Sequence, residues 1–460
     1  METAAKIKYP IVFVTGIGQT WTSLKGSDKY RWNLFPRNRE IIFDNLPAKE
    51  KYRIISAVSG IFRFLALGGR QPEQIKIQSA LESILRHCRV NDDGSFNDQT
   101  DIHIYGTRSF EQLGSTDFYT GEPTNITERT LLDRLLRDIP CRDFVGEYGN
   151  ENMYCFNYSP FSDLYSAADE LHKTLGGILK SRQEDKVILV PMSMGAAVTL
   201  AYIDAYFDEN GAKAENYIHH VVSVVGAWDG SEGFADLLEG RVNKDWDKLF
   251  FDDIIASSSM PGFAKSILLK NHGRTNTVIR QLLDALLDGI LLRSSSFPAL
   301  VPSGRWEDMY GYLFSEKRME RNSRLKYVRE QTDRFIKAQK NLRKLMKSMH
   351  ENCGIRFSFT GGTGLRPGEE SRDFDFMKLL RCSDRCDTDG VLQQSSAFPF
   401  DMKNPESFVS AYTVFDKQMH EIGNNPEAMR IIFDLISEKE NDPPHFVPKN
   451  QGGVIDDSAE

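Results

Sequence analysis

The 460-residue chain has no apolar run long enough to cross a bilayer and no apolar signal core near its N-terminus. Its longest lightly charged stretch, residues 54–69, contains Arg63 and is shorter than the roughly 20 residues that a transmembrane helix needs. The first residues, METAAKIKYPIVFVTG, hold only the short apolar run IVFV, which is typical of a first core strand. These absences predict a soluble, cytoplasmic protein.

Two further absences limit the classes of ligand. The six cysteines, at positions 88, 141, 155, 353, 382 and 386, show no CxxC spacing, so we expect reduced thiols and no zinc or other metal site. The formal net charge is −8, which argues against a nucleic-acid partner bound through phosphate contacts. The sequence also contains no internal repeat.

Short β-branched runs alternate with helical patterns along most of the chain. Strands are predicted at 11–14, 187–190, 221–225 and 355–359. The segment 163–181 carries apolar residues three or four positions apart, which predicts an amphipathic helix. Strands that alternate with helices favour an α/β fold, with a mostly parallel central sheet and helices on both faces.

The pattern changes between residues 236 and 350, where no convincing strand is predicted. The segment 277–292 is strongly apolar and helical, and 324–350 is predicted to be one long basic helix. We predict that 236–350 is a helical cap inserted between two parts of the core, 1–235 and 351–436. The polar, Pro- and Gly-rich residues 437–460 are predicted to form a loose tail.

The segment PMSMG places Ser193 between the strand at 187–190 and a run of small residues that begins at Gly195. A nucleophile elbow has this layout, because its Ser projects from a tight strand-to-helix turn whose neighbours must be small. Pro191 departs from the GxSxG pattern, since it stands where the first Gly is expected and has no backbone N–H. The alternative is that Ser193 caps a helix starting at residue 194.

A nucleophilic Ser also needs N–H groups that stabilise an oxyanion. One is predicted to be the backbone N–H of Met194, directly after Ser193. The second is predicted to be that of Ile17, since Gly16 and Gly18 flank it in a loop after the strand 11–14. A phosphate-binding loop is the alternative, but GIGQT lacks the GK[ST] of a P-loop and the third Gly of a dinucleotide-binding motif.

The base and its orienting carboxylate are expected after the nucleophile, in the chain order Ser, Asp, His. Asp389 lies in a predicted loop after the strand 355–359, and His420 lies just before a last helical pattern. We therefore predict Asp389 as the orienter and His420 as the base. His445, in the predicted tail, is the main rival, because the other histidines fall in or beside helical or strand-like patterns.

Several segments, taken in order, resemble the lecithin:cholesterol acyltransferase-like branch of the α/β-hydrolases. VFVTGIGQT resembles the first strand and oxyanion loop of that family, and VILVPMSMGAAVTLAYI resembles its elbow. VVSVVGAWDGSEG is similar to a Pro-Trp-Gly-Gly segment, and SFPALVPSGRWEDMY is similar to a cap segment. FTGGTG and DTDGVLQQSSAF match the late strand and the Asp loop, whereas FNYSPFSD keeps only the aromatic character of the segment before the elbow.

The resemblance covers about residues 11–436 and implies an α/β-hydrolase fold. It also implies that Ser193, Asp389 and His420 form a catalytic triad, with Ile17 and Met194 at the oxyanion hole. Residues of the same segments are expected to contact substrate: Gly16, Gly18, Trp21 and Trp228.

The leading hypothesis is a serine lipase, phospholipase or acyltransferase that acts on acyl-ester lipids through an acyl-enzyme, without a cofactor. The apolar segments 54–68 and 277–292 would allow transient contact with a membrane surface, with ordinary core packing as the alternative. Two other functions stay open: a catalytically silent hydrolase-like binding protein, favoured by Pro191, and an esterase or thioesterase for small soluble substrates. No oligomeric state is predicted.

Overall fold

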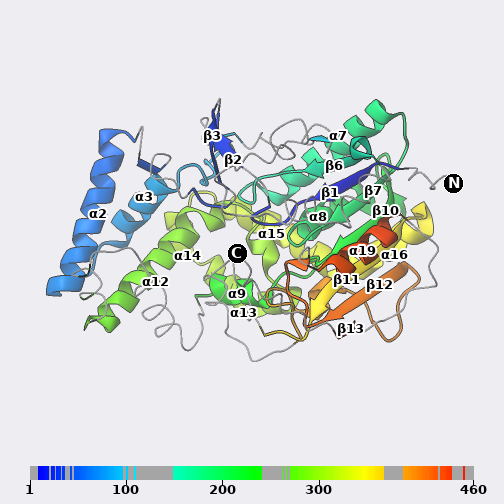
Figure 1. Ribbon diagram of the computed structural model, residues 1–460. Helices are drawn as coiled ribbons and strands as arrows, with labels where there is room; N and C mark the ends of the chain where they lie inside the picture. Colours follow the sequence, from blue (N-terminus) through cyan, green and yellow to red (C-terminus); the bar gives the residue numbers. More distant parts are fainter. Residues whose placement is uncertain are drawn as a thin grey trace, which may run out of the picture.

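A computed structural model describes residues 9–19, 22–25, 27–32, 34–36, 42–43, 46–96, 100–101, 108–109, 149–240, 262, 266, 270–366, 387–422, 425–437 and 449–450. Its centre is an eight-stranded sheet (Figure 1). The strand order is β13 (Lys449–Asn450), β12 (Val409–Asp416), β11 (Arg356–Thr363), β10 (Ile218–Val224), β7 (Val187–Pro191), β1 (Ile11–Val14), β6 (Met153–Phe156) and β5 (Arg108–Ser109). All neighbours pair in parallel except β5 and β6.

Helices cover both faces of this sheet. Along β1, Val12 and Val14 join a core cluster with α7 (Leu164–Arg182) and α8 (Gly195–Tyr206). The alternate residues Ile11 and Phe13 join a second cluster with α19 (Pro426–Ile436) on the opposite face. Because successive strand residues point to opposite faces, a sheet buried on both sides needs apolar residues at every position. The predicted α/β fold with a mostly parallel sheet and helices on both faces is therefore confirmed.

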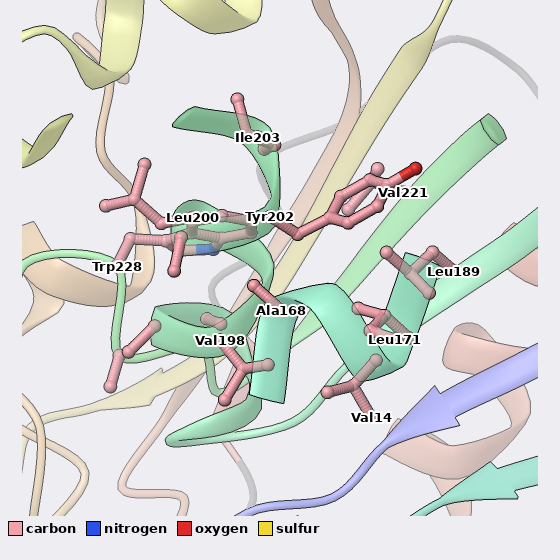
Figure 2. Close-up of a cluster of buried hydrophobic side chains, with 14 of the residues drawn as sticks. Val14, Ala168, Leu171, Leu189, Val198, Leu200, Tyr202, Ile203, Val221 and Trp228 are labelled. Carbon is pink, nitrogen blue, oxygen red and sulfur yellow. The ribbon is translucent and has the colours of Figure 1, made fainter. Parts of the chain in front are cut away.

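The core between α7, α8 and the sheet is tightly packed (Figure 2). Small residues on the buried side of α8, Ala196 and Ala197, let the helix lie close to the strands. The approach is closest at Gly195, where an added Cβ would lie 2.2 Å from the carbonyl oxygen of Val14. The turn from β7 into α8 thus presses against β1, and only glycine fits at its first helical residue.

Most predicted helices agree with the structure, but the single helix predicted over 324–350 is wrong. The chain forms two helices there, α15 (Leu325–Lys340) and α16 (Leu342–Cys353), separated by Asn341. The N–H of Asn341 donates to the carbonyl oxygens of Lys337 and Ala338, both at 3.1 Å, which closes the last turn of α15. Asn favours helix ends because its side chain competes for backbone hydrogen bonds. Apolar periodicity continues across the break and therefore conceals it.

Three helices pack together at the end of the molecule away from the sheet (Figure 1). They are α2 (Ala48–Leu67), α3 (Gln74–Ile84) and α12 (His272–Gly289), the last of which contains most of the predicted 277–292 helix. The shorter helices are α9 (Glu232–Leu238), α13 (Trp306–Leu313), α14 (Glu316–Arg321) and α18 (Gln394–Ala397). None of the helices in the described ranges is both long and apolar enough to traverse a membrane.

Two small antiparallel sheets complete the fold. One consists of β3 (Ser27–Trp32), β2 (Thr22–Leu24) and β4 (Thr100–Asp101), and the other of β8 (Phe207–Asp208) and β9 (Gly211–Ala212). They were not among the predicted strands.

The predicted cap, 236–350, contributes helices at two places in the molecule. Side chains of α12, α13 and α14 pack in a hydrophobic cluster that is separate from the main core. Helices α15 and α16 instead pack on α8. Phe335 of α15 and Met346 of α16 belong to the same core cluster as α7 and α8. The end of this segment is therefore part of the main helical layer. Of the predicted tail, Lys449 and Asn450 form β13, and residues 438–448 and 451–460 lie outside the described ones.

Candidate active site

Ser193 sits in a strained turn between β7 and α8. Its φ is 49°, in the left-handed region that side chains with a Cβ rarely adopt. Such a conformation costs roughly 1–3 kcal/mol and persists where neighbouring contacts hold it. Here the Ser193 N–H donates to the carbonyl oxygen of Val224 at 3.1 Å, and its own carbonyl accepts from the N–H of Ala227 at 2.9 Å. The backbone of β10 and of the loop after it thus fixes the turn from outside.

Pro191 does not prevent this geometry. It is the last residue of β7, lies in register with Val14 of β1, and is followed by Met192, whose N–H donates to the Val14 carbonyl at 3.0 Å. Donors from β7 to the β1 side fall on alternate residues, Ile188 to the Pro10 carbonyl at 2.8 Å and Met192 to that of Val14, so the proline removes no donor from this ladder. Although Pro191 has no N–H, Ser193 two residues later still adopts the left-handed conformation.

The side chains of Ser193, His420 and Asp389 form one chain of hydrogen bonds. His420 Nε2 lies 2.9 Å from Ser193 Oγ, and His420 Nδ1 lies 2.8 Å from Asp389 Oδ2. The other carboxylate oxygen, Asp389 Oδ1, accepts from the N–H groups of Val391 at 3.0 Å and Leu392 at 2.7 Å. The Asp389 side chain is 1% exposed and that of His420 is 15% exposed, so the bonds lie in a largely dry site that still opens at the imidazole.

The loops that carry Asp389 and His420 are joined backbone to backbone. The His420 N–H donates to the carbonyl oxygen of Asp389 at 2.9 Å. Gly362, in the FTGGTG segment of β11, makes this approach feasible, because an added Cβ would lie 2.2 Å from the Gln418 carbonyl oxygen and 2.9 Å from Asp389 Cβ. The adjacent strands β11 and β12 thus deliver the carboxylate and the imidazole to the same edge of the sheet as Ser193.

The loop after β1 lies against the elbow. An added Cβ on Gly16 would lie 2.8 Å from Ser193 Cβ, so this position tolerates only glycine without displacement. Within the described residues, the backbone N–H groups of Ile17 and Met194 donate to no acceptor. Met194 precedes the first residue of α8, where backbone N–H groups are not used by the helix.

Gln19 is a residue of this site that sequence reasoning missed. The side-chain oxygen Oε1 of Gln19 accepts a hydrogen bond from the backbone N–H of Gly16 at 2.6 Å. The backbone N–H of Gln19 donates to the Gly16 carbonyl oxygen at 3.3 Å. These two bonds close the loop around Ile17 and Gly18, and Gly18 adopts a φ of 75° there. The signal in the sequence was the glutamine directly after GIG, because its side-chain amide can reach back to the start of its own loop.

Of the two tryptophans expected to contact substrate, the structure describes only Trp228. Trp228 is 0% exposed, and its indole Nε1 donates to Ser223 Oγ at 2.8 Å within the core (Figure 2). A ring without exposed surface is a packing residue, so the expectation that Trp228 contacts substrate is not supported. Trp21 lies outside the described residues, as does His445, the rival of His420.

The strand order of the central sheet and the positions of Ser193, Asp389 and His420 along it identify the fold. A parallel sheet carries a Ser on a left-handed turn after β7, an Asp in the loop after β11, and a His after β12, in the chain order expected of one superfamily. The chain has the α/β-hydrolase fold.

Comparisons with known proteins add little to this fold assignment. No protein-family model matches the chain, and no curated protein matches it. Among solved structures, a Tle4–Tli4 complex is similar at 12% identity and a TM-score of 0.40, covering 95% of this chain and 100% of that one. The mature lipase BlEst2 of Bacillus licheniformis is similar at 14% identity and a TM-score of 0.31, covering 65% of this chain and 86% of that one. Values this low transfer no activity.

The electrostatics of the site favour a protonated imidazole. Burial lowers the pKa of His420, but the carboxylate of Asp389 and the hydrogen bond to it outweigh burial and leave the pKa above its ordinary value. A base must be neutral to accept a proton from Ser193. If His420 is that base, activity should fall as the pH drops through this raised pKa, which places the acid limb above about pH 6.5.

Asp389→Asn should shift the acid limb of the pH–activity profile. Removing the negative charge lowers the pKa of His420, so the midpoint of the acid limb should shift to lower pH, while the maximal rate falls by about 10³- to 10⁴-fold because the imidazole loses its orienting acceptor. The measurement is kcat/KM for an activated ester against pH in both proteins. An unchanged midpoint would mean that Asp389 does not act on the titrating group.

Proposed function

We propose that this chain is a serine hydrolase that cleaves acyl esters through an acyl-enzyme on Ser193. The observation that carries the proposal is the hydrogen-bonded series from Ser193 through His420 to Asp389, beside the two available N–H groups of Ile17 and Met194. A Ser hydroxyl next to an oriented imidazole is a nucleophile, whereas an isolated Ser is not.

The proposed reaction has two halves. His420 Nε2 accepts the proton of Ser193 Oγ as that oxygen attacks the ester carbonyl, and the N–H groups of Ile17 and Met194 stabilise the resulting oxyanion. His420 then protonates the leaving alcohol, and the carbon–oxygen bond to that alcohol breaks. In the second half His420 takes a proton from water as the water attacks the acyl carbon, and it returns that proton to Ser193 Oγ as the bond between Oγ and the acyl carbon breaks and the acid leaves. Attack by a second alcohol instead of water would give acyl transfer.

We further propose that the acyl group comes from a lipid. An apolar cluster of Leu237, Leu283 and Val391 joins α9 and α12 to the loop of Asp389, and Val391 follows Asp389 by only two residues. We propose that this cluster contacts the acyl chain of the substrate. The segment resemblances to the lecithin:cholesterol acyltransferase-like branch also support a lipid substrate, and we propose that the early part of 236–350 acts as the cap.

Leu283→Asp is expected to discriminate between long and short acyl chains. Losing contact with two or three methylenes, at about 0.8 kcal/mol each, should lower kcat/KM roughly 10- to 50-fold more for p-nitrophenyl palmitate than for the butyrate. Leu283→Ala is the matched control and should give a smaller change in the same direction. Equal losses on both esters would place the acyl chain elsewhere.

Leu287 cannot serve for the same test. It is 3% exposed and packs in a cluster with Ile290 and Leu291, so Leu287→Asp should unfold the region rather than alter specificity. The two substitutions on one helix thus compare the position that we propose to face substrate with a core position, and circular dichroism on both variants shows which of them stays folded.

The experiment that tests the proposed function compares three substrates: p-nitrophenyl butyrate, p-nitrophenyl palmitate and phospholipid in vesicles. We expect turnover of the palmitate ester and of the phospholipid. Turnover of the butyrate alone would instead favour an esterase for small soluble substrates. A folded protein that hydrolyses none of the three would favour a catalytically silent binding protein.

A further inference from the structure

Helix α2 exposes large apolar side chains along its outer side. Tyr52 is 72% exposed, Ile55 63% and Val58 56%, and they recur every three residues. Leu67 at the end of α2 is 79% exposed, and Ile75 at the start of α3 is 68% exposed. Most of the large exposed apolar side chains in the described ranges lie on these two helices, at the end of the molecule away from the sheet (Figure 1).

These side chains are not needed for the packing of α2. The opposite side of the helix already packs: Ile54 and Ala57 form a cluster with Ala80 of α3, and Phe64 and Leu65 form one with Val278 of α12. The helix is thus buried through one side and apolar on the other. Several exposed apolar side chains on one helix face indicate an interaction surface.

The charged residues of α2 indicate which kind of partner is complementary to its exposed side. Its exposed cations Lys49, Lys51 and Arg63 lie on or beside the outer side, and none has an acidic partner among the described residues. Glu50 is the one acidic residue of the helix, and it pairs with Arg53 at 2.8 Å. The helix is therefore cationic on a chain of net charge −8. Apolar side chains interleaved with Lys and Arg suit an anionic bilayer surface, where the former enter the acyl boundary and the latter meet phosphate groups.

The surface is also linked to the candidate active site. Helix α12 packs on α2 and α3, and its Leu283 packs against Leu237, as does Val391 of the Asp389 loop. Helix α12 thus lies between the packed side of α2 and the loop of the proposed orienter. We propose that the outer side of α2, with the start of α3, docks the protein on a membrane that contains anionic lipids. The consequence for lipid hydrolysis rests on the proposed function, whereas the docking itself does not.

Sedimentation with vesicles tests the docking. Full-length protein and its Ser193→Ala variant should bind vesicles of phosphatidylcholine mixed with phosphatidylglycerol, should bind phosphatidylcholine alone more weakly, and should dissociate as salt is raised. Ile55→Asp combined with Val58→Asp should weaken binding to the mixed vesicles at least about tenfold. Because both side chains are more than half exposed, the double variant should melt as the wild type does.

A charge-matched pair of triple variants tests the electrostatic part. Lys49→Glu with Lys51→Glu and Arg63→Glu should remove the preference for phosphatidylglycerol, by at least about tenfold. The control triple reverses exposed lysines of α7 and α16, which lie outside the surface: Lys173, Lys344 and Lys347. The control should bind as the wild type does, because it changes the net charge by the same amount but leaves the outer side of α2 intact.

Two results would overturn the docking proposal: a wild type that ignores mixed vesicles, and an Ile55/Val58 variant that binds them unchanged. If that variant also loses a self-association seen in the wild type, the surface is a contact between protein chains. Hydrolysis of soluble p-nitrophenyl butyrate by the Ile55/Val58 variant should stay at the wild-type rate. Failure of the wild type to hydrolyse any ester, with vesicle binding intact, would instead refute only the hydrolase function.

Discussion

Ser193→Ala should lower kcat/KM for ester hydrolysis at least about 10³-fold, leaving only what binding and oxyanion stabilisation supply. The substitution removes one oxygen, whose bond in the site is to His420 Nε2. The backbone bonds that hold the turn, to Val224 and Ala227, remain. Thermal unfolding should therefore stay cooperative and close to that of the wild type. Steady-state kinetics and circular dichroism on the same preparation measure both outcomes.

Ser193→Gly is the control for the geometry of the turn. Glycine adopts a φ of 49° without the steric cost that a Cβ imposes, so this variant should be as inactive as Ser193→Ala and at least as stable. Activity of either variant within tenfold of the wild type would remove Ser193 from the mechanism.

His420→Ala should match the loss in Ser193→Ala, because the hydroxyl is a poor nucleophile without its base. The double variant should be no worse than either single variant, since residues that act as a unit in catalysis are strongly non-additive. His445→Ala should retain activity. The measurement is kcat/KM on one activated ester for all four proteins. A dead His445→Ala variant with an active His420→Ala variant would assign the base to the tail.

The elements of the site were predictable because each carries a local constraint. Ser193 follows an apolar strand and precedes small residues, and the close contact of Gly195 with β1 is the reason those residues are small. Asp389 and His420 follow the adjacent parallel strands β11 and β12 in chain order, and the carboxyl ends of parallel strands meet at one edge. Pattern and order together placed three distant residues near one another.

Features that depend on what covers a side chain could not be predicted in the same way. Trp228 follows a strand near the site, but only the packed structure reveals that its ring points into the core and bonds Ser223. The apolar residues of 54–68 are split between a packed side and an exposed side, and composition does not distinguish the two. The break at Asn341 leaves the apolar period intact, so periodicity cannot detect it.

The most direct test of the central proposal is covalent labelling with a lipid-like fluorophosphonate, followed by identification of the modified peptide. An activated Ser attacks the phosphorus and expels fluoride, whereas an ordinary Ser does not react. We expect a single label on Ser193, absent from Ser193→Ala and strongly slowed in His420→Ala. Labelling at another residue, or no labelling of the folded wild type, would contradict the assignment of Ser193 as the nucleophile of a serine hydrolase.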